Sequence, residues 1–289
     1  MPKKYLAFDL ETAKVLPEHV SDLLAHRPLG ICCAAAVASD GLQPKIWYGR
    51  KIDGTPAPRM TAQDAQALVH DLHHEVGRGY TLLSWNGLDF DFNILAEESG
   101  LRDECAELAA NHVDMMFHTL CALGYFPSLD KAAQGMGLGA KAAGVRGHQA
   151  PVLWAEGHHS EVQEYNVRDA QLTVALALAC ERVGVLRWVT RKGTLSAMGL
   201  PQGWLQVSRA RALPEPDTSW MQDPPRREDF FRWFRTARDK DERSAVERPT
   251  LEDASAKKVM GCPRCGQRLR VPLTGASLRC PRCQNVFHS

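Results

Sequence analysis

The first 85 residues alternate between short apolar runs and polar turns, a pattern typical of β-strands. We predict strands over four of these runs: Tyr5–Asp9, Gly30–Ser39, Lys45–Gly49 and Tyr80–Trp85. Before the last of them, Thr61 begins a segment whose apolar residues recur with the spacing of an amphipathic helix.

Beyond residue 85 the apolar positions recur every three to four residues, which indicates helices. We predict helices over four segments: Asp91–Glu98, Leu101–Ala109, Ser128–Gln134 and Ser160–Val183. Leu186–Arg191 is expected to be a closing strand. Strands first, with helices folded over them, predict an α/β fold in which a mixed sheet is flanked by helices.

After residue 212 prolines and charges replace the apolar periodicity. We expect three parts: a main domain over residues 1–212, a linker over 213–258, and a small C-terminal module over 259–289. Within the linker, Arg226–Arg238 has the pattern of one basic amphipathic helix. The C-terminal module is too short to build a hydrophobic core of its own, so another kind of bond must hold it.

Charge and cysteines divide the chain in the same way. The net charge of the 289 residues is +1, but residues 1–212 carry 20 Lys and Arg against 23 Asp and Glu, and the remainder carries 15 against 11. No apolar run approaches the ~20 residues of a membrane span, and the N-terminus leads directly into a core strand rather than a signal peptide. Nine unevenly spaced cysteines are a poor disulfide framework, so we expect a soluble cytoplasmic protein.

Three short motifs carry carboxylates into the predicted fold. Asp9 and Glu11 are two residues apart on a strand and share one face, while Asp91 follows a strand at the start of a helix. Tyr165 and Asp169 are four apart on one face of the longest predicted helix. Each motif alone has a plain structural alternative: a solvated strand end, a helix cap, or a surface tyrosine–aspartate pair.

The order of these motifs, Asp-x-Glu, then Asn-x3-Phe-Asp-x3-Leu, then Tyr-x3-Asp, resembles the DEDD 3′–5′ exonucleases over roughly residues 3–190. That family has a ribonuclease H-like fold, so the resemblance implies a ribonuclease H-like mixed sheet. The Tyr-x3-Asp spacing resembles the DEDDy branch, which includes the proofreading domains of family-B DNA polymerases. The DEDDh branch would place histidine where this chain has Glu164.

The resemblance implies a phosphodiester hydrolase that releases 5′-mononucleotides with the help of two Mg²⁺ or Mn²⁺ ions. Asp9 would bridge both ions, Glu11 and Asp169 would complete the ion that holds the attacking water, and Asp91 would support the second ion. Tyr165 would hold that water or help to deprotonate it.

Three further residues are candidate contacts to the substrate strand. Thr12 sits where the family's backbone meets the terminal nucleotide, Asn86 lies at a strand end, and Phe90 is a candidate for stacking on a base, with core packing as its alternative. The expected substrate is a single-stranded or frayed 3′ end, with DNA favoured, although spacing alone does not distinguish DNA from RNA.

The last 28 residues contain two Cys-x2-Cys pairs separated by 14 residues: Cys262, Cys265, Cys280 and Cys283. Four thiolates at this spacing are typical of one structural Zn²⁺ in a zinc ribbon, whose metal bonds replace the missing core. A redox role for one pair would need a thioredoxin-like fold around it. Residues 259–289 hold five Arg and no Asp or Glu, which suits contacts with nucleic acid or with a protein partner.

The alternative function is a nucleic-acid-binding adaptor that recognises 3′ ends without cleaving them. In that reading the ribbon docks the chain onto a replication, repair or RNA-processing partner. Neither reading involves a membrane.

Overall fold

The computed structural model describes residues 3–18, 20, 22–139, 147–234, 257–265, 268–272, 277–279, 283 and 285–288. The chain divides into two compact units, Met1–Phe234 and Arg235–Ser289.

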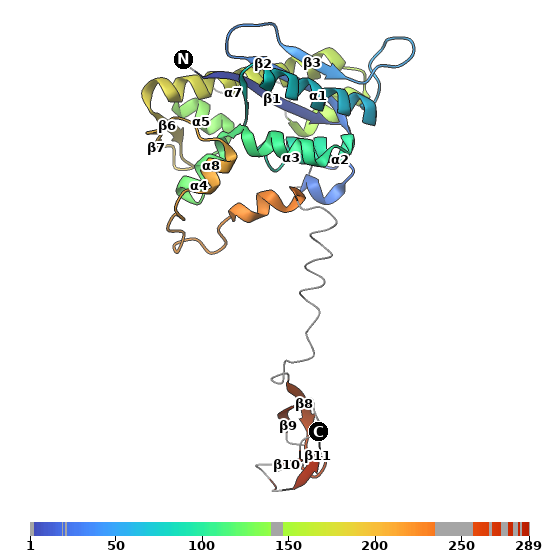
Figure 1. The fold of residues 1–289 in the computed structure, drawn as a ribbon, viewed down its shortest axis with the longest axis vertical. Coiled ribbons are helices and arrows are strands. Elements are labelled where there is room, and N and C mark those ends of the chain that lie inside the picture. The colour runs from blue at the N-terminus through green and yellow to red at the C-terminus, as the bar shows by residue number, and fades with distance from the viewer. Residues whose placement is uncertain are drawn as a thin grey trace. The chain divides into compact units, whose positions relative to one another are not determined.

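The N-terminal unit is built on a five-stranded sheet (Figure 1). Its strands, in the order in which they lie side by side, are β3 (Lys45–Tyr48), β2 (Ile31–Ala38), β1 (Lys4–Thr12), β4 (Tyr80–Ser84) and β5 (Val113–Asp114). β1 is antiparallel to β2 and parallel to β4, so the sheet is mixed and β1 is its central strand. The predicted α/β fold class is confirmed.

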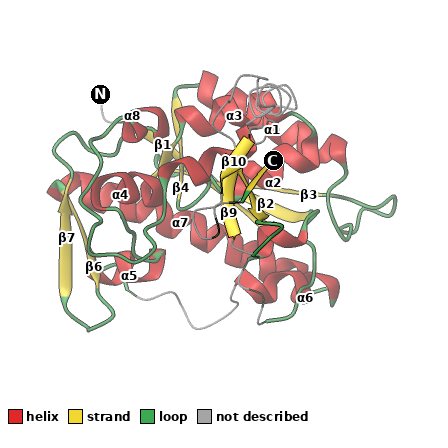
Figure 2. Ribbon diagram, turned by 90° about the horizontal axis from the view of Figure 1, so that it is seen from below, coloured by secondary structure: helices red, strands yellow, loops and turns green. Residues whose placement is uncertain are grey.

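Helices cover both faces of this sheet (Figures 1 and 2). The α-helices are α1 (Ala62–Gly77), α2 (Asp91–Ser99), α3 (Arg102–Asn111), α4 (Met115–Leu123), α5 (Leu129–Gly135), α6 (Ala150–Ala155), α7 (His159–Val183) and α8 (Val207–Arg211). The 3₁₀ helices are η1 (Leu23–His26), η2 (Gly147–Gln149) and η3 (Arg227–Phe234). Of the described helices, none combines the length and the apolar composition needed to cross a bilayer.

The alternation of side chains along β1 assigns the two faces. Leu6, Phe8 and Leu10 pack with apolar residues of α1, α2 and α3, whereas Tyr5 and Ala7 pack with apolar residues of α7. Because successive residues of a strand point to opposite faces, the odd-numbered positions of β1 all point toward α7.

Helix α1 begins where its sequence predicts. The Thr61 side chain accepts a hydrogen bond from the Asp64 amide, and the Asp64 carboxylate accepts one from the Thr61 amide, which completes a capping box. The reciprocal bonds satisfy two amides that have no partner within the helix.

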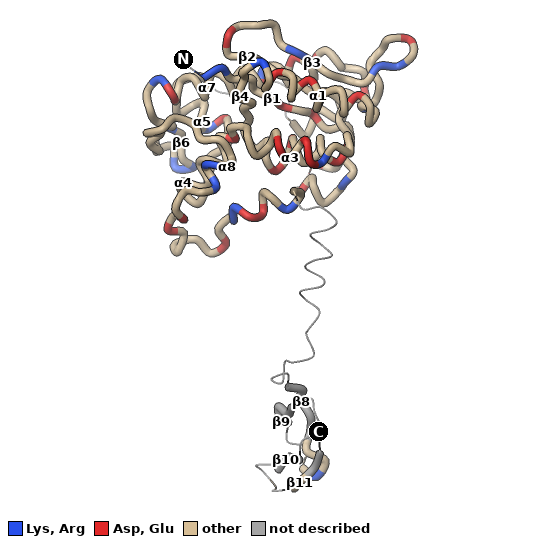
Figure 3. Tube along the Cα trace, viewed as in Figure 1, with Lys and Arg blue, Asp and Glu red and all other residues tan. Residues whose placement is uncertain are grey.

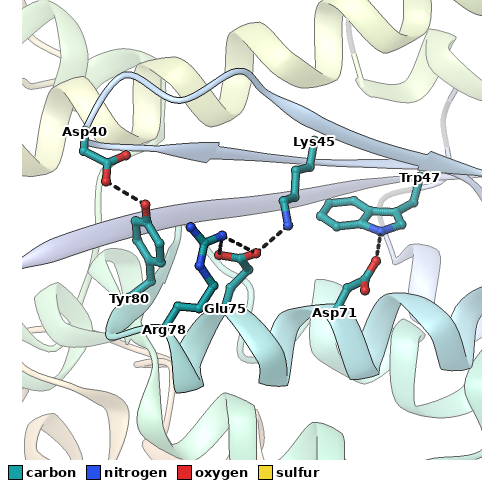
Figure 4. Close-up of polar contacts among 7 residues, drawn as sticks. All are labelled: Asp40, Lys45, Trp47, Asp71, Glu75, Arg78 and Tyr80. Atoms are coloured by element: carbon teal, nitrogen blue, oxygen red, sulfur yellow. Dashed lines mark hydrogen bonds and ion pairs between the residues drawn. The ribbon is translucent and has the colours of Figure 1, made fainter.

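A polar cluster joins α1 to the edge of the sheet (Figure 4). The Glu75 carboxylate is 2% exposed and accepts hydrogen bonds from Arg78, at 3.1 Å, and from Lys45 of β3. Trp47 of the same strand donates its indole N–H to Asp71 at 2.7 Å. Burial alone would raise the pKa of Glu75, but the hydrogen bonds and charges of Lys45 and Arg78 outweigh it and lower that pKa.

The N-terminal unit continues to Phe234, beyond the domain boundary that we expected at residue 212. Part of the expected linker forms η3, whose aromatic side chains Phe230, Phe231 and Trp233 lie in the same core as α1–α4. The guanidinium of Arg227, 5% exposed, donates to four backbone carbonyls: those of Cys121, Arg211, Leu213 and Pro214. These bonds hold the chain after α8 against the domain.

The strand expected over Leu186–Arg191 forms β6 (Val185–Val189), but it pairs with β7 (Leu195–Gly199) in a separate hairpin and not with the main sheet (Figure 2). The C-terminal unit also consists of hairpins in its described residues. There β8 (Lys257–Gly261) pairs with β9 (Arg268–Pro272), and β10 (Ser277–Arg279) pairs with β11 (Val286–His288), each antiparallel.

The Glu75 cluster makes a stability prediction. Glu75→Gln removes the charge that Lys45 and Arg78 share, so the free energy of unfolding should fall by about 1–3 kcal/mol at pH 7. A lowered pKa in the folded state means that this stabilisation is present above the unfolded pKa of glutamate and is lost as the pH falls through the folded pKa. The free energies of unfolding of the variant and the wild type should therefore become similar in acid.

Urea unfolding of both proteins between pH 3 and pH 7 measures this difference. Glu107→Gln, an exposed glutamate on α3, is the control and should change little at any pH. An equal loss of unfolding free energy in Glu75→Gln and Glu107→Gln would show that the Glu75 cluster is not a source of stability.

Candidate active site

The end of β1 brings two carboxylates to the face of the sheet that α7 covers. Asp9 is half-buried and Glu11 is 7% exposed, and both occupy odd-numbered positions of the strand. The spacing of the two residues predicted a shared face, and the packing of Tyr5 and Ala7 against α7 identifies which face it is.

Helix α7 supplies the residues opposite this strand end. The Asn166 side chain is fully buried and donates a hydrogen bond from Nδ2 to Asp9 Oδ2 at 2.5 Å. Its Oδ1 is buried without a hydrogen-bond partner. Tyr165, 9% exposed, and Asp169 lie one turn apart and share a hydrogen bond. Sequence reasoning missed Asn166, although it lies between the two residues of the Tyr-x3-Asp motif.

Asp91 reaches the same site from α2. It is the first residue of that helix, yet it is not the helix cap, because the N-cap is Phe90 and has no side-chain capping bond. The Asp91 carboxylate, 3% exposed, instead accepts a hydrogen bond from the Leu10 amide of β1 at 2.9 Å. This bond ties the second motif to the strand between Asp9 and Glu11.

A second aspartate shapes the loop that precedes Asp91. Asp114, 1% exposed, accepts hydrogen bonds from the amides of Asn86, Leu88 and Phe117 at 2.9–3.1 Å. Asn86 has a φ of 77°, in the left-handed region, which asparagine tolerates better than most residues. Asp114 therefore has a structural task, and it caps α4 at the same time.

Burial and neighbouring charges raise the pKa of several groups in this site. Burial raises the pKa of Glu11 well above its ordinary value, and the charges of Asp9, Asp169 and Asp91 add to the shift. Burial also raises the pKa of Asp91 to about 7. The Tyr165 pKa rises as well, because of burial first, then the charges of Glu11 and Asp169 and the hydrogen bond to Asp169. Such a group of carboxylates is costly unless cations neutralise it.

The donor set fits hard divalent cations. Carboxylate oxygens dominate it, as Mg²⁺ and Mn²⁺ prefer, and the free Oδ1 of Asn166 is a further buried oxygen beside Asp9.

A β-bulge places two cysteines beside the acidic group. Glu11 pairs with Cys33 and Thr12 pairs with Ile31, so Cys32 is an extra residue in β2. Cys32 and Cys33 consequently lie in one cluster with α6 and the start of α7, although neighbours in a regular strand point to opposite faces. The hydrogen bond with Cys32 and burial raise the pKa of the Cys33 thiol. The bulge that brings the two cysteines together has no local signal in the sequence.

The expected substrate contacts lie on the segments that carry the carboxylates. Thr12, 8% exposed, ends β1 directly after Glu11, and Asn86 and Phe90 belong to the loop before Asp91. Phe90 is half-buried and packs against the main core, as its structural alternative supposed.

The C-terminal unit brings together three of its four expected metal ligands. The sulfur atoms of Cys262, Cys265 and Cys283 all lie within 4.8 Å of one another, and those of Cys262 and Cys283 are 3.6 Å apart. Thiolates 2.3 Å from a tetrahedral Zn²⁺ are separated by about 3.8 Å, whereas a disulfide needs about 2.05 Å. The spacing therefore fits a metal centre. Cys280 lies outside the described residues.

Comparison with protein families places part of the chain in a known superfamily model. Residues 50–177 match the RNase_H_2 family model, described as RNase_H superfamily. The matched segment contains Asp91, Tyr165 and Asp169 and lies C-terminal to Asp9 and Glu11. Among curated proteins none matches this chain. The match and the mixed sheet together identify a ribonuclease H-like domain and support membership of a superfamily of metal-dependent nucleases.

The mutual repulsion of the carboxylates predicts how metal acts on stability. Glu11→Gln should raise the free energy of unfolding of dialysed protein at pH 7 by about 1 kcal/mol, since a raised folded pKa means that the charged form destabilises the fold. For the same reason, wild-type stability should increase as the pH falls through about 7, where Asp91 takes up a proton.

Added Mg²⁺ or Mn²⁺ should raise the melting temperature of the wild type, by the equivalent of about 2.7 kcal/mol at a hundredfold excess over Kd, and the Glu11→Gln variant should lose most of this response. Glu164→Gln, an exposed glutamate on α7, serves as the control and should respond like the wild type. A metal response that survives Glu11→Gln unchanged would contradict the assignment of this site.

Proposed function

We propose that this protein is a metal-dependent 3′–5′ exonuclease of the DEDDy type that hydrolyses phosphodiester bonds at single-stranded or frayed 3′ ends. The observation that carries the proposal is the convergence of Asp9, Glu11, Asp91 and Tyr165–Asp169 from three separate segments on one buried site. The ribonuclease H-like domain around them supports the same chemistry.

Asp9, Glu11, Asp91 and Asp169 would hold two Mg²⁺ or Mn²⁺ ions. When bound, such ions activate a water, stabilise the charge that develops on the phosphate and neutralise the leaving 3′-oxygen. The protein's own contribution is orientation. Asn166 fixes the carboxylate of Asp9 through a hydrogen bond, and the Leu10 amide fixes that of Asp91.

Tyr165 is suited to positioning the attacking water. Its raised pKa keeps the hydroxyl protonated at neutral pH, and its hydrogen bond to Asp169 orients it, so the phenol oxygen is available to accept a hydrogen bond from the water. Thr12, Asn86 and Phe90 are proposed contacts to the terminal nucleotides, and their placement beside the carboxylates supports this role.

The C-terminal unit is proposed to be a zinc ribbon in which Cys262, Cys265, Cys280 and Cys283 bind one Zn²⁺. The sulfur spacing of the described cysteines supports a tetrahedral thiolate site. With five Arg and no acidic residue in 259–289, the ribbon suits binding to the phosphates of the substrate or docking to a protein partner.

An oligonucleotide assay tests the activity. With Mg²⁺ or Mn²⁺ the full chain should release 5′-mononucleotides from the 3′ end of a 5′-labelled strand. Asp9→Asn should lower the rate at least 10³-fold by removing the bridging carboxylate, and Tyr165→Phe should lower it about 10²-fold by removing the hydroxyl. Glu164→Gln is the matched control on α7 and should leave the rate unchanged.

Parallel digestion of matched DNA and RNA strands, single and duplex, identifies the preferred substrate. Binding of 3′ ends without release of nucleotides, with either metal, would favour the adaptor function instead. Release of nucleotides from the 5′ end, or cleavage inside the strand, would contradict the proposed 3′–5′ polarity but would still agree with a nuclease.

The ribbon predicts one zinc ion per chain. Cys265→Ser should abolish bound zinc, as measured by native mass spectrometry, because three thiolates no longer form a closed tetrahedral site. Cleavage of a very short oligonucleotide should persist, since the N-terminal unit is compact in its own right. Cys105→Ala, a cysteine of α3, is the control and should keep one zinc; zinc retained in full by Cys265→Ser would overturn the assignment.

A further inference from the structure

A cavity of about 730 Å³ lies beside the β6–β7 hairpin. Its walls come from the segment before α5, from β6 and the turn that follows it, and from a loop after α8. The lining residues are Tyr125, Phe126, Pro127, Ser128, Lys131, Trp188, Val189, Thr190, Arg191, Trp220 and Met221. None of the roles described above uses this cavity.

Three aromatic rings form a row in its wall. Tyr125 makes an edge-to-face contact with Trp188, with ring centroids 6.2 Å apart, and another with Trp220, at 5.9 Å. Trp188 is 4% exposed and anchors the row in the core, whereas Trp220 is 68% exposed. A hydrogen bond from the Trp220 indole to the Asp217 carbonyl, at 3.2 Å, orients this exposed ring. A fixed, exposed indole is a surface on which a flat ring stacks at little entropic cost.

The charges in the lining are all of one sign. Lys131 and Arg191 are the charged residues there, and no Asp or Glu takes part. Figure 3 shows basic residues near β6. A ligand that complements this cavity therefore has a flat aromatic ring and a negative charge, as a nucleotide has.

Helix α7 links the cavity to the carboxylate site. It carries Tyr165 and Asp169, and it also contacts α5 and β6, which contribute Lys131 and Trp188 to the lining of the cavity. None of the carboxylate-site residues lines the cavity, so a strand bound at both places would put different nucleotides in each.

We propose that this cavity binds an unpaired nucleotide of the substrate strand, several positions upstream of the 3′ end that lies at the carboxylates. Its base stacks on Trp220, and Arg191 and Lys131 contact the adjoining phosphates. The inference rests on the proposed function, since it assumes that the 3′ end occupies the carboxylate site. It predicts that a long strand binds more tightly than a short one, and that this difference depends on Trp220 and Arg191.

The test compares the binding of single strands of 3 and 12 nucleotides, measured by fluorescence anisotropy of the full chain without added divalent ions. Trp220→Ala should weaken binding of the 12-mer about 5- to 150-fold, the range expected for one lost stacking partner, and leave the 3-mer unchanged. Arg191→Ala should also weaken the 12-mer and reduce the salt dependence of its binding by about one phosphate contact.

Two controls come from the same hairpin. Leu195→Ala removes a side chain that is 65% exposed and lies outside the cavity, and Lys192→Ala removes a positive charge next to Arg191 that does not line it. Neither substitution should weaken binding of the 12-mer as much as Trp220→Ala or Arg191→Ala does. Melting temperatures of all variants should match the wild type, because the replaced side chains are exposed.

The outcomes separate the two proposals. If the wild type cleaves strands but Trp220→Ala and Arg191→Ala bind the 12-mer as well as it does, the cavity does not bind nucleotides, and the nuclease proposal stands. If the wild type shows no cleavage while these variants lose 12-mer binding, the cavity proposal stands and the nuclease proposal fails. If the wild type neither binds nor cleaves, both are overturned.

Discussion

The constraint on which the N-terminal unit depends is the confinement of several carboxylates at the end of its central strand. Glu11 and Asp91 are almost fully buried, and together with Asp9 and Asp169 they raise the free energy of the metal-free fold. Packing around them must therefore be strong enough to keep them in place. Metal ions bound by the carboxylates would relieve this repulsion.

The surrounding structure holds two of the carboxylates from different directions. Asn166 binds Asp9 from α7, and the Leu10 amide binds Asp91 from β1. Asp114 fixes the loop that precedes Asp91, through the backbone amides of Asn86 and Leu88. Trp233 of η3 donates its indole N–H to the Leu88 carbonyl of that loop at 2.7 Å, so the segment after α8 also supports the site. This contact gives a physical reason for the unit to extend to Phe234.

Charge is partitioned in a way that suits nucleic acid. The carboxylates bring negative charge only to a place where cations are expected to bind, while the cavity beside β6 and the C-terminal unit present Lys and Arg. The carboxylate site repels phosphates unless metal ions are bound to it. The Lys and Arg residues of the cavity and of the C-terminal unit attract phosphates. A strand would thus be held along its backbone by basic residues and approached by acidic groups only through metal ions.

Local chemistry made much of this protein predictable from its sequence alone. The Thr61–Asp64 capping box, the shared face of Asp9 and Glu11, the one-turn spacing of Tyr165 and Asp169, and the Cys-x2-Cys pairs all involve residues within four positions of each other. Helical and strand geometry fixes such relations before any tertiary contact forms. The alternating apolar runs likewise sufficed for the α/β fold class.

Only the tertiary structure decided features that join distant segments. Asn166 donates a hydrogen bond to Asp9, 157 positions away. The bulge at Cys32 depends on the pairing of β1 with β2, and Arg227 donates hydrogen bonds to carbonyls on separate segments. The prolines and charges around η3 predicted a linker, within which the pattern of Arg226–Arg238 indicated a basic amphipathic helix. The burial of its aromatic face and the Arg227 bonds place this segment in the core. The hairpin cavity likewise assembles from three segments. The local sequence does not specify these contacts, because each depends on how elements pack against one another.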